Sequence, residues 1–61
     1  MKKFNSYCVR FTLLNHDDIY LELSLYSYDT ETAVETARFI LSKSLEIHPD
    51  RLCLDIAYLE V

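Results

Sequence analysis

The side chains that could hold a metal ion are few and stand in two separate polar segments. His16 is followed by Asp17 and Asp18, and His48 stands two residues before Asp50. A zinc or other transition-metal site needs such ligands at a recognisable spacing or on elements that converge. Neither segment has such a spacing. We therefore expect both segments to be solvated turns, and we expect no metal site.

The two cysteines, Cys8 and Cys53, are predicted to be free thiols. A disulfide needs Cα atoms within about 7 Å, whereas strands with level ends would place Cys8 opposite Ala57, several residues from Cys53. A catalytic thiolate would need a nearby base or a helix N-terminus, and the sequence indicates neither. Paired acids and nucleophile–base pairs are also missing, and a chain without glycine has no glycine-rich phosphate loop. The sequence thus predicts a protein that is not an enzyme and uses no cofactor.

Size and composition predict a single domain over residues 1–61 that associates with a partner. A chain of 61 residues buries only about 60% of its unfolded surface. Because 51% of its residues are hydrophobic, apolar surface remains to be covered, often by self-association. No run has transmembrane length and no signal-peptide apolar region follows the first residues. With two cysteines only, a cytoplasmic chain is expected.

The charge balance disfavours nucleic acid as a partner. The net charge is −4, and the six basic residues are scattered along the chain. Proteins of this size that bind nucleic acid normally have a basic excess, because contacts with phosphates supply most of the affinity.

The hydrophobic periodicity changes once, from two to about three and a half, next to Asp29. Alternating apolar and polar residues predict strands over about residues 4–14 and 19–27, joined by a loop at 15–18. A third strand is predicted over about residues 51–60. Between them, Asp29 is the expected N-cap of a helix that ends before Pro49. The order of elements is therefore ββαβ.

The predicted helix has an apolar stripe and a wet side. The stripe that packs on the sheet comprises Ala33, Val34, Ala37, Ile40, Leu41, Ser44 and Leu45. The wet side comprises Glu31, Thr32, Glu35, Arg38, Lys43 and Glu46. Phe39 lies off the stripe and could cover its margin or anchor a partner.

These elements predict an α+β fold with a three-stranded antiparallel sheet in the order 2-1-3 and the helix packed on one face. From the third strand, Leu52, Leu54, Ile56 and Tyr58 are expected to face the core. The opposite sheet face would then be open. It is expected to consist of Cys8, Arg10, Thr12, Tyr20, Glu22, Tyr26, Cys53, Asp55, Ala57 and Leu59.

This open face and the surrounding acids are the predicted partner-binding surface. Tyr20 and Tyr26 are the candidate anchors, since tyrosine is enriched in protein interfaces. The candidate charges, which would engage a basic groove, are Glu22, Asp55, Asp17, Asp18, Glu31 and Glu35. Three interpretations compete: an ordinary solvated face, a protein or homodimer interface, and a platform on which single-stranded bases stack. The free edges of the second and third strands are a second route to a partner.

Residues 25–39 resemble the strand-to-helix junction of small acidic phage proteins that inhibit host RNA polymerase. The matching positions are Ala33, Glu35, Ala37 and Phe39. HicB-type antitoxins are also similar, with a Met-Lys-Lys start and two strands before such a junction. Their glycine-rich turn is replaced here by residues 15–18, Asn-His-Asp-Asp. The resemblance covers about a quarter of the chain and transfers no functional residue.

Taken together, we expect a small acidic protein-binding module, of the kind by which a phage or mobile element inhibits a host enzyme or defence complex through surface docking. One alternative is a homodimeric antitoxin-like or regulatory protein. The second alternative is single-stranded nucleic-acid binding through the sheet tyrosines.

Overall fold

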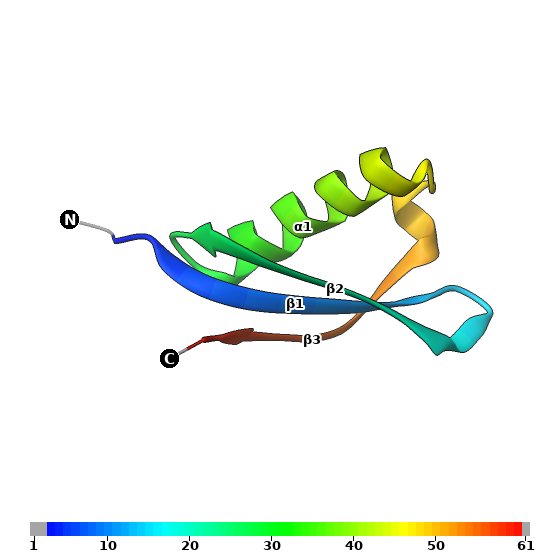
Figure 1. The fold of residues 1–61 in the computed structure, drawn as a ribbon, viewed down its shortest axis with the longest axis horizontal. Helices are drawn as coiled ribbons and strands as arrows, with labels where there is room; N and C mark the ends of the chain where they lie inside the picture. Colours follow the sequence, from blue (N-terminus) through cyan, green and yellow to red (C-terminus); the bar gives the residue numbers. More distant parts are fainter. Residues whose placement is uncertain (1–2, 61) are drawn as a thin grey trace.

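A computed structural model describes residues 3–60 and contains three strands and one long helix. The elements are β1 (Asn5–Leu13), β2 (His16–Ser27), α1 (Thr30–Leu45), the short 3₁₀ helix η1 (Pro49–Arg51) and β3 (Leu52–Leu59). The strands are antiparallel and ordered β2-β1-β3, and α1 crosses one face of the sheet (Figure 1). The predicted α+β fold with ββαβ order is confirmed.

The core lies between α1 and the central strand β1. Val9 and Phe11 of β1 are fully buried, and Leu52 at the start of β3 is nearly so. On the helix, Ala33 and Ala37 are also fully buried. Their small side chains let the helix backbone approach the sheet closely, so one turn of α1 rests directly on β1.

The hairpin turn is shorter than the predicted loop over residues 15–18. Only Leu14 and Asn15 form the turn, and Asn15 has a φ of 69°, a left-handed conformation that asparagine tolerates in the absence of glycine. β2 already begins at His16. Its pairing with β1 steps from His16 opposite Leu13 to Tyr20 opposite Thr12, so residues 17–19 are extended but have no partner on β1.

The start of α1 agrees with the prediction that Asp29 is its N-cap. The Asp29 carboxylate accepts a hydrogen bond from the amide of Thr32 at 2.8 Å, which satisfies one of the free amides of the first turn. The helix ends at Leu45, where Glu46 takes a left-handed conformation with a φ of 54°. Pro49 follows later and opens η1 instead.

The buried side of α1 is rotated relative to the predicted stripe. Ile40, Ser44 and Leu45, which were expected in the core, are exposed. Arg38, expected on the wet side, is half-buried: its guanidinium donates hydrogen bonds to the carbonyls of Pro49 and Leu52. The side of α1 that bears Arg38 thus faces η1 and the start of β3, where the guanidinium binds both carbonyls.

A β-bulge in β3 overturns the predicted facing of its second half. The pairing with β1 shifts between Arg10 and Phe11, so that Ile56 lies opposite Arg10, Leu54 lies opposite Phe11, and Asp55 is an extra residue. A bulge of one residue inverts the alternation that follows it. The predicted core residues Ile56 and Tyr58 are therefore on the open face. The predicted open-face residues Ala57 and Leu59 lie on the helix side, where Ala57 packs against the core.

Candidate partner-binding surface

The sheet face opposite α1 is covered by no element within residues 3–60 (Figure 1). Its residues alternate along the three strands, and the carboxylate of Glu60 reaches it from the end of β3. We call this surface the open face. It consists of Ser6, Cys8, Arg10, Thr12, Tyr20, Glu22, Ser24, Tyr26, Cys53, Asp55, Ile56, Tyr58 and Glu60.

Arg10, on the central strand, holds carboxylates from both neighbouring strands. Its Nε lies 3.1 Å from Oε2 of Glu22 on β2, and its Nη1 lies 3.6 Å from Oδ2 of Asp55 on β3. The guanidinium also lies 5.5 Å from the centre of the Tyr20 ring. The hydrogen bond to Glu22 is the main reason that the pKa of Arg10 is raised above its usual value. Three predicted partner-binding residues, Tyr20, Glu22 and Asp55, are thus brought together around one cation.

Asp55 lies on the open face, as the alternation predicted, although it is the extra residue of the bulge. As the extra residue of β3, Asp55 stands between the positions opposite Phe11 and Arg10. About two fifths of its side chain and of the Arg10 side chain is exposed, and ion pairs at such exposure typically stabilise a fold by less than about 1 kcal/mol. The main effect of the pairs is therefore to orient the charges on the open face.

Glu60 is a second acidic group of the open face, which the sequence did not indicate. Ser6 donates a hydrogen bond to its Oε1 at 2.7 Å, and Ser24 donates one to its Oε2 at 3.5 Å. Within residues 3–60 no cation forms an ion pair with this carboxylate. Glu60 therefore remains an uncompensated negative charge held in place by two hydroxyls. Glu60 is the last residue of the predicted third strand, and the predicted alternation places it on the helix side with Ile56 and Tyr58. The bulge in β3 moves all three to the open face.

Cys8 and Tyr58 are neighbours on the open face, opposite each other on β1 and β3. Cys8 is only 3% exposed. A hydrogen bond with the Cys8 side chain is the largest cause that raises the pKa of Tyr58 above its usual value, followed by the charge of the cysteine. Cys53 lies opposite Thr12, four positions away along β1, and both cysteines are free thiols, as predicted. The predicted neighbour of Cys8 was Ala57, and the bulge in β3 replaces it with Tyr58.

The other predicted partner-binding residues are not part of the Arg10 cluster. Tyr26 is 74% exposed but stands six positions from Tyr20 on β2, about 20 Å along an extended strand. Asp17 and Asp18 belong to the exposed segment of β2 near the hairpin turn. Glu31 and Glu35 are exposed on α1, on the helix side of the sheet and not on the open face.

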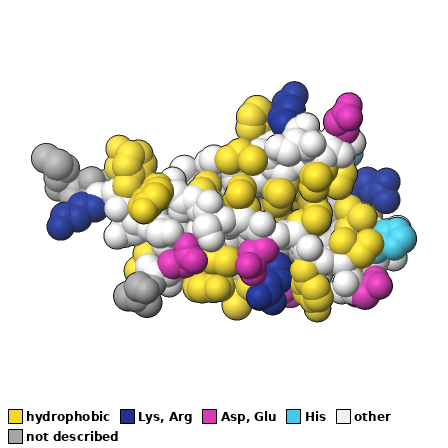
Figure 2. Space-filling model, viewed as in Figure 1, with side chains coloured by type: hydrophobic (Ala, Val, Ile, Leu, Met, Phe, Trp, Pro, Cys, Tyr) yellow, Lys and Arg dark blue, Asp and Glu magenta, His cyan; other side chains and the backbone are white. Residues whose placement is uncertain are grey.

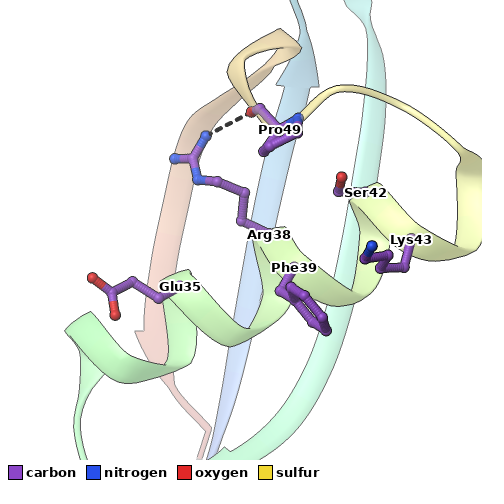
Figure 3. A pocket seen from close by; sticks show the side chains of 6 residues that line it. All are labelled: Glu35, Arg38, Phe39, Ser42, Lys43 and Pro49. Atoms are coloured by element: carbon purple, nitrogen blue, oxygen red, sulfur yellow. Dashed lines mark hydrogen bonds between the residues drawn. The ribbon is translucent and has the colours of Figure 1, made fainter.

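A shallow hollow of about 360 Å³ lies on the helix side, between α1 and η1 (Figure 3). Phe39 is 63% exposed there, and the Lys43 ammonium lies 5.7 Å from the centre of its ring. Arg38, which also lines the hollow, is turned toward the carbonyl of Pro49. The lining residues are Glu35, Arg38, Phe39, Ser42, Lys43 and Pro49.

Large apolar side chains remain exposed over much of the molecule (Figure 2). Such a surface is unusual for a small protein that stays alone, because contiguous apolar patches normally mark interaction sites. The most exposed are Tyr26, Phe39, Phe4 and Tyr20. The Phe4 ring stacks on the Tyr28 ring, with ring centres 4.2 Å apart. On β3 the exposed apolar residues are Leu54, Ile56, Tyr58 and Leu59.

The two histidine segments lie at the start of β2 and in the 3₁₀ turn before β3. His48 is the N-cap of η1, where its Nδ1 accepts a hydrogen bond from the Asp50 amide at 3.2 Å. Over residues 3–60, no group of three His, Cys, Asp or Glu side chains is arranged to hold a metal ion. Within the same residues, no helix has the length and apolar character needed to cross a membrane.

Comparison with protein-family models, with curated proteins and with solved structures finds no match to this chain.

Proposed function

We propose that this protein is a non-catalytic binding module whose open face docks on a basic surface of a partner protein. The observation that carries the proposal is the charge arrangement around Arg10. Glu22, Asp55 and Glu60 supply three carboxylates to the open face, whereas Arg10 is its only cation among residues 3–60. The fixed surplus of negative charge favours a partner surface rich in arginine or lysine.

Exposed aromatic and aliphatic side chains beside these charges supply the apolar part of the proposed contact. Tyr20 is 58% exposed, and Ile56 and Tyr58 are each 44% exposed. Each side chain stands on a strand, so its backbone is already ordered and only side-chain entropy is lost when a partner covers it. Apolar anchors surrounded by oriented charges are typical of protein interfaces.

In its narrower form, the proposal is that the partner is a host enzyme or defence complex and that the protein is an inhibitor encoded by a phage or mobile element. Its support is the small size, the net charge of −4 and the resemblance of residues 25–39 to phage inhibitors of host RNA polymerase.

The docking proposal can be tested with two charge reversals that change the net charge equally. Glu22→Lys alters the open face, and Glu31→Lys alters α1 on the other side of the sheet. A partner captured by the tagged wild-type chain should bind Glu22→Lys at least about tenfold more weakly and Glu31→Lys nearly as well as wild type. Circular dichroism checks that both variants fold. Equal weakening by the two variants, or by neither, would refute the open face as the docking surface.

The same pair of variants separates protein docking from single-stranded nucleic-acid binding. If bases stacked on Tyr20 and Tyr26, replacing an acid by a lysine would strengthen binding, because it adds a contact to phosphate. A gel-shift titration with a labelled single-stranded oligonucleotide measures this. Tighter oligonucleotide binding by Glu22→Lys than by Glu31→Lys, on top of measurable wild-type binding, would replace the protein-docking proposal.

A further inference from the structure

The outer edge of β3 is free in the described chain, because β3 is hydrogen-bonded only to β1. Figure 1 shows β3 along one border of the sheet, with α1 above the sheet and not beside this strand. A free strand edge presents unpaired amides and carbonyls to another strand. A strand from a second sheet can therefore form hydrogen bonds with this edge.

The hydrogen-bond pattern identifies which residues of β3 point their backbone groups outward. The Glu60 amide donates to the Ser6 carbonyl at 2.8 Å, so these two residues form a hydrogen-bonded pair. Such pairs alternate with non-hydrogen-bonded pairs along an antiparallel ladder. Tyr58 and Ile56 therefore bond to β1, whereas Ala57 and Leu59 direct their amides and carbonyls toward the free edge.

The side chains of β3 do not protect this edge. Leu54, Ile56, Tyr58 and Leu59 are 44–48% exposed, and the strand contains no lysine, arginine or proline. Its single charged residue, Asp55, is paired with Arg10. Natural proteins usually block an exposed edge with charges, proline or a bulge. The bulge of β3 lies at Asp55, so the residues that follow it form an unblocked, apolar edge, which indicates an interface.

The opposite edge of the sheet is unsuited to pairing with its own copy. β2 contains Asp17, Asp18 and Glu22, and its residues 17–19 already depart from regular pairing with β1. Two such strands side by side would bring like charges together, and like charges across a strand pair are destabilising. This contrast selects β3 as the edge that fits a second copy of the chain.

We propose that β3 pairs antiparallel with β3 of a second copy about a two-fold axis through Tyr58. In this register, Ala57 faces Leu59 of the partner subunit on the helix side, and these two residues supply the backbone hydrogen bonds. Tyr58 faces Tyr58 of the partner subunit on the open face, in a non-hydrogen-bonded pair where side chains approach most closely. The two-fold symmetry makes the contact self-complementary and closed.

The result is a six-stranded sheet in which both helices lie on one side and both open faces form one continuous surface on the other. The inference goes beyond the proposed docking function and does not depend on it, because it rests on the backbone and apolar side chains of β3 and not on the carboxylates of the open face.

Two proline substitutions test the interface directly. In Ala57→Pro the missing amide is one that β1 does not use, so the fold should tolerate it as an edge strand. The matched control is Ser24→Pro on β2, whose amide also points outward because Ser24 lies opposite Cys8 in a non-hydrogen-bonded pair. Light scattering coupled to size exclusion should give twice the 7.2 kDa of one chain for wild type and Ser24→Pro. It should give a single chain for Ala57→Pro.

A charge swap at Tyr58 tests the register even if Ala57→Pro does not fold. Tyr58→Lys and Tyr58→Glu should each be monomeric, because each places two like charges opposite each other. An equimolar mixture should recover the dimer through opposite charges. A monomeric wild-type chain throughout a dilution series, a dimer of folded Ala57→Pro as tight as wild type, or no recovery in the mixture would each overturn the proposal.

Discussion

Arg10 and Tyr58 show how much the open face depends on single side chains. Arg10 keeps Glu22 and Asp55 within 4 Å of one guanidinium, so its removal would leave two neighbouring carboxylates to repel each other. Tyr58 lies opposite Cys8. The pKa of Tyr58 is raised first by a hydrogen bond with the Cys8 side chain, and then by the charge of Cys8, by burial and by the charges of Glu22 and Glu60. The open face thus favours the neutral phenol.

We predict that Tyr58 ionises at a higher pH than an unperturbed tyrosine. Its pKa is raised in the folded chain above the usual value of about 10. The stability that this neutral phenol contributes is complete below about pH 10 and is lost as the pH rises through the folded pKa. Ultraviolet titration of the tyrosines should resolve one late group that is missing in Tyr58→Phe.

The control for this titration is Cys8→Ala, which removes the hydrogen-bond partner. The late group should then ionise closer to pH 10, since the contact with Cys8 is the largest cause of the shift. An unchanged titration of Cys8→Ala would show that this contact does not determine the Tyr58 pKa.

Two elements, β3 and α1, differ from the sequence prediction. The bulge at Asp55 divides β3 into a first part that follows the predicted alternation and a second part that reverses it. The helix α1 is attached to η1 by Arg38, whose guanidinium also lies 5.1 Å from the centre of the Phe11 ring. Arg38 thereby connects the helix, the 3₁₀ turn and the core.

We predict that Arg38→Met lowers the free energy of unfolding by about 1–3 kcal/mol, because it removes charge-assisted hydrogen bonds to two carbonyls. Arg38→Lys should restore only part of this, since the shorter lysine side chain cannot place its ammonium at the position of Nη1, which donates both bonds. Lys43→Met on the exposed side of the helix is the matched control and should stay within about 0.5 kcal/mol of wild type. Urea denaturation measures all three. If Arg38→Met is as stable as Lys43→Met, Arg38 does not hold the helix in place.

The whole molecule is small, elongated and only marginally able to bury its apolar residues. The Cα atoms extend over 40 × 20 × 14 Å, a thin arrangement of one helix on one sheet. Its accessible surface of 4504 Å² is about a tenth above the roughly 4,100 Å² that its mass implies for a compact monomer. Pairing through β3 would cover part of this excess, which is the reason that the proposed dimer suits the molecule as a whole.

Substitutions of a buried and an exposed phenylalanine test which residues form the core. A chain of this length is stable by about 3–9 kcal/mol, and truncating a fully buried phenylalanine costs about 3–5 kcal/mol. Phe11→Ala, at a position with no exposure, should therefore unfold most of the protein, whereas Phe39→Ala, at a position 63% exposed, should stay within about 0.5 kcal/mol of wild type. Thermal unfolding followed by circular dichroism measures both. A cooperative transition of Phe11→Ala near that of wild type would contradict the assignment of the core.

Part of the candidate site could be predicted from the sequence. Alternation in the second strand places Tyr20 and Glu22 on one face, and this is where they lie. The role of Arg10 as the shared partner of Glu22 and Asp55 could not be predicted, because it requires the register of three strands. Glu60 was missed for a related reason: its contacts with Ser6 and Ser24 join residues far apart in the chain.

The sequence by itself determined the order of elements, the cap at Asp29 and the sheet order, because these follow from local periodicity, local hydrogen bonding and the allowed connections between neighbouring elements. Only the tertiary structure decided which way Ile56 and Tyr58 face and that Arg38 turns inward. The bulge has no characteristic residue pattern that could be recognised in the sequence. The carbonyls that bind Arg38 lie near it only in the folded chain. Which residues lie on the open face therefore depends on strand register and packing, and the alternation of apolar and polar residues does not predict these.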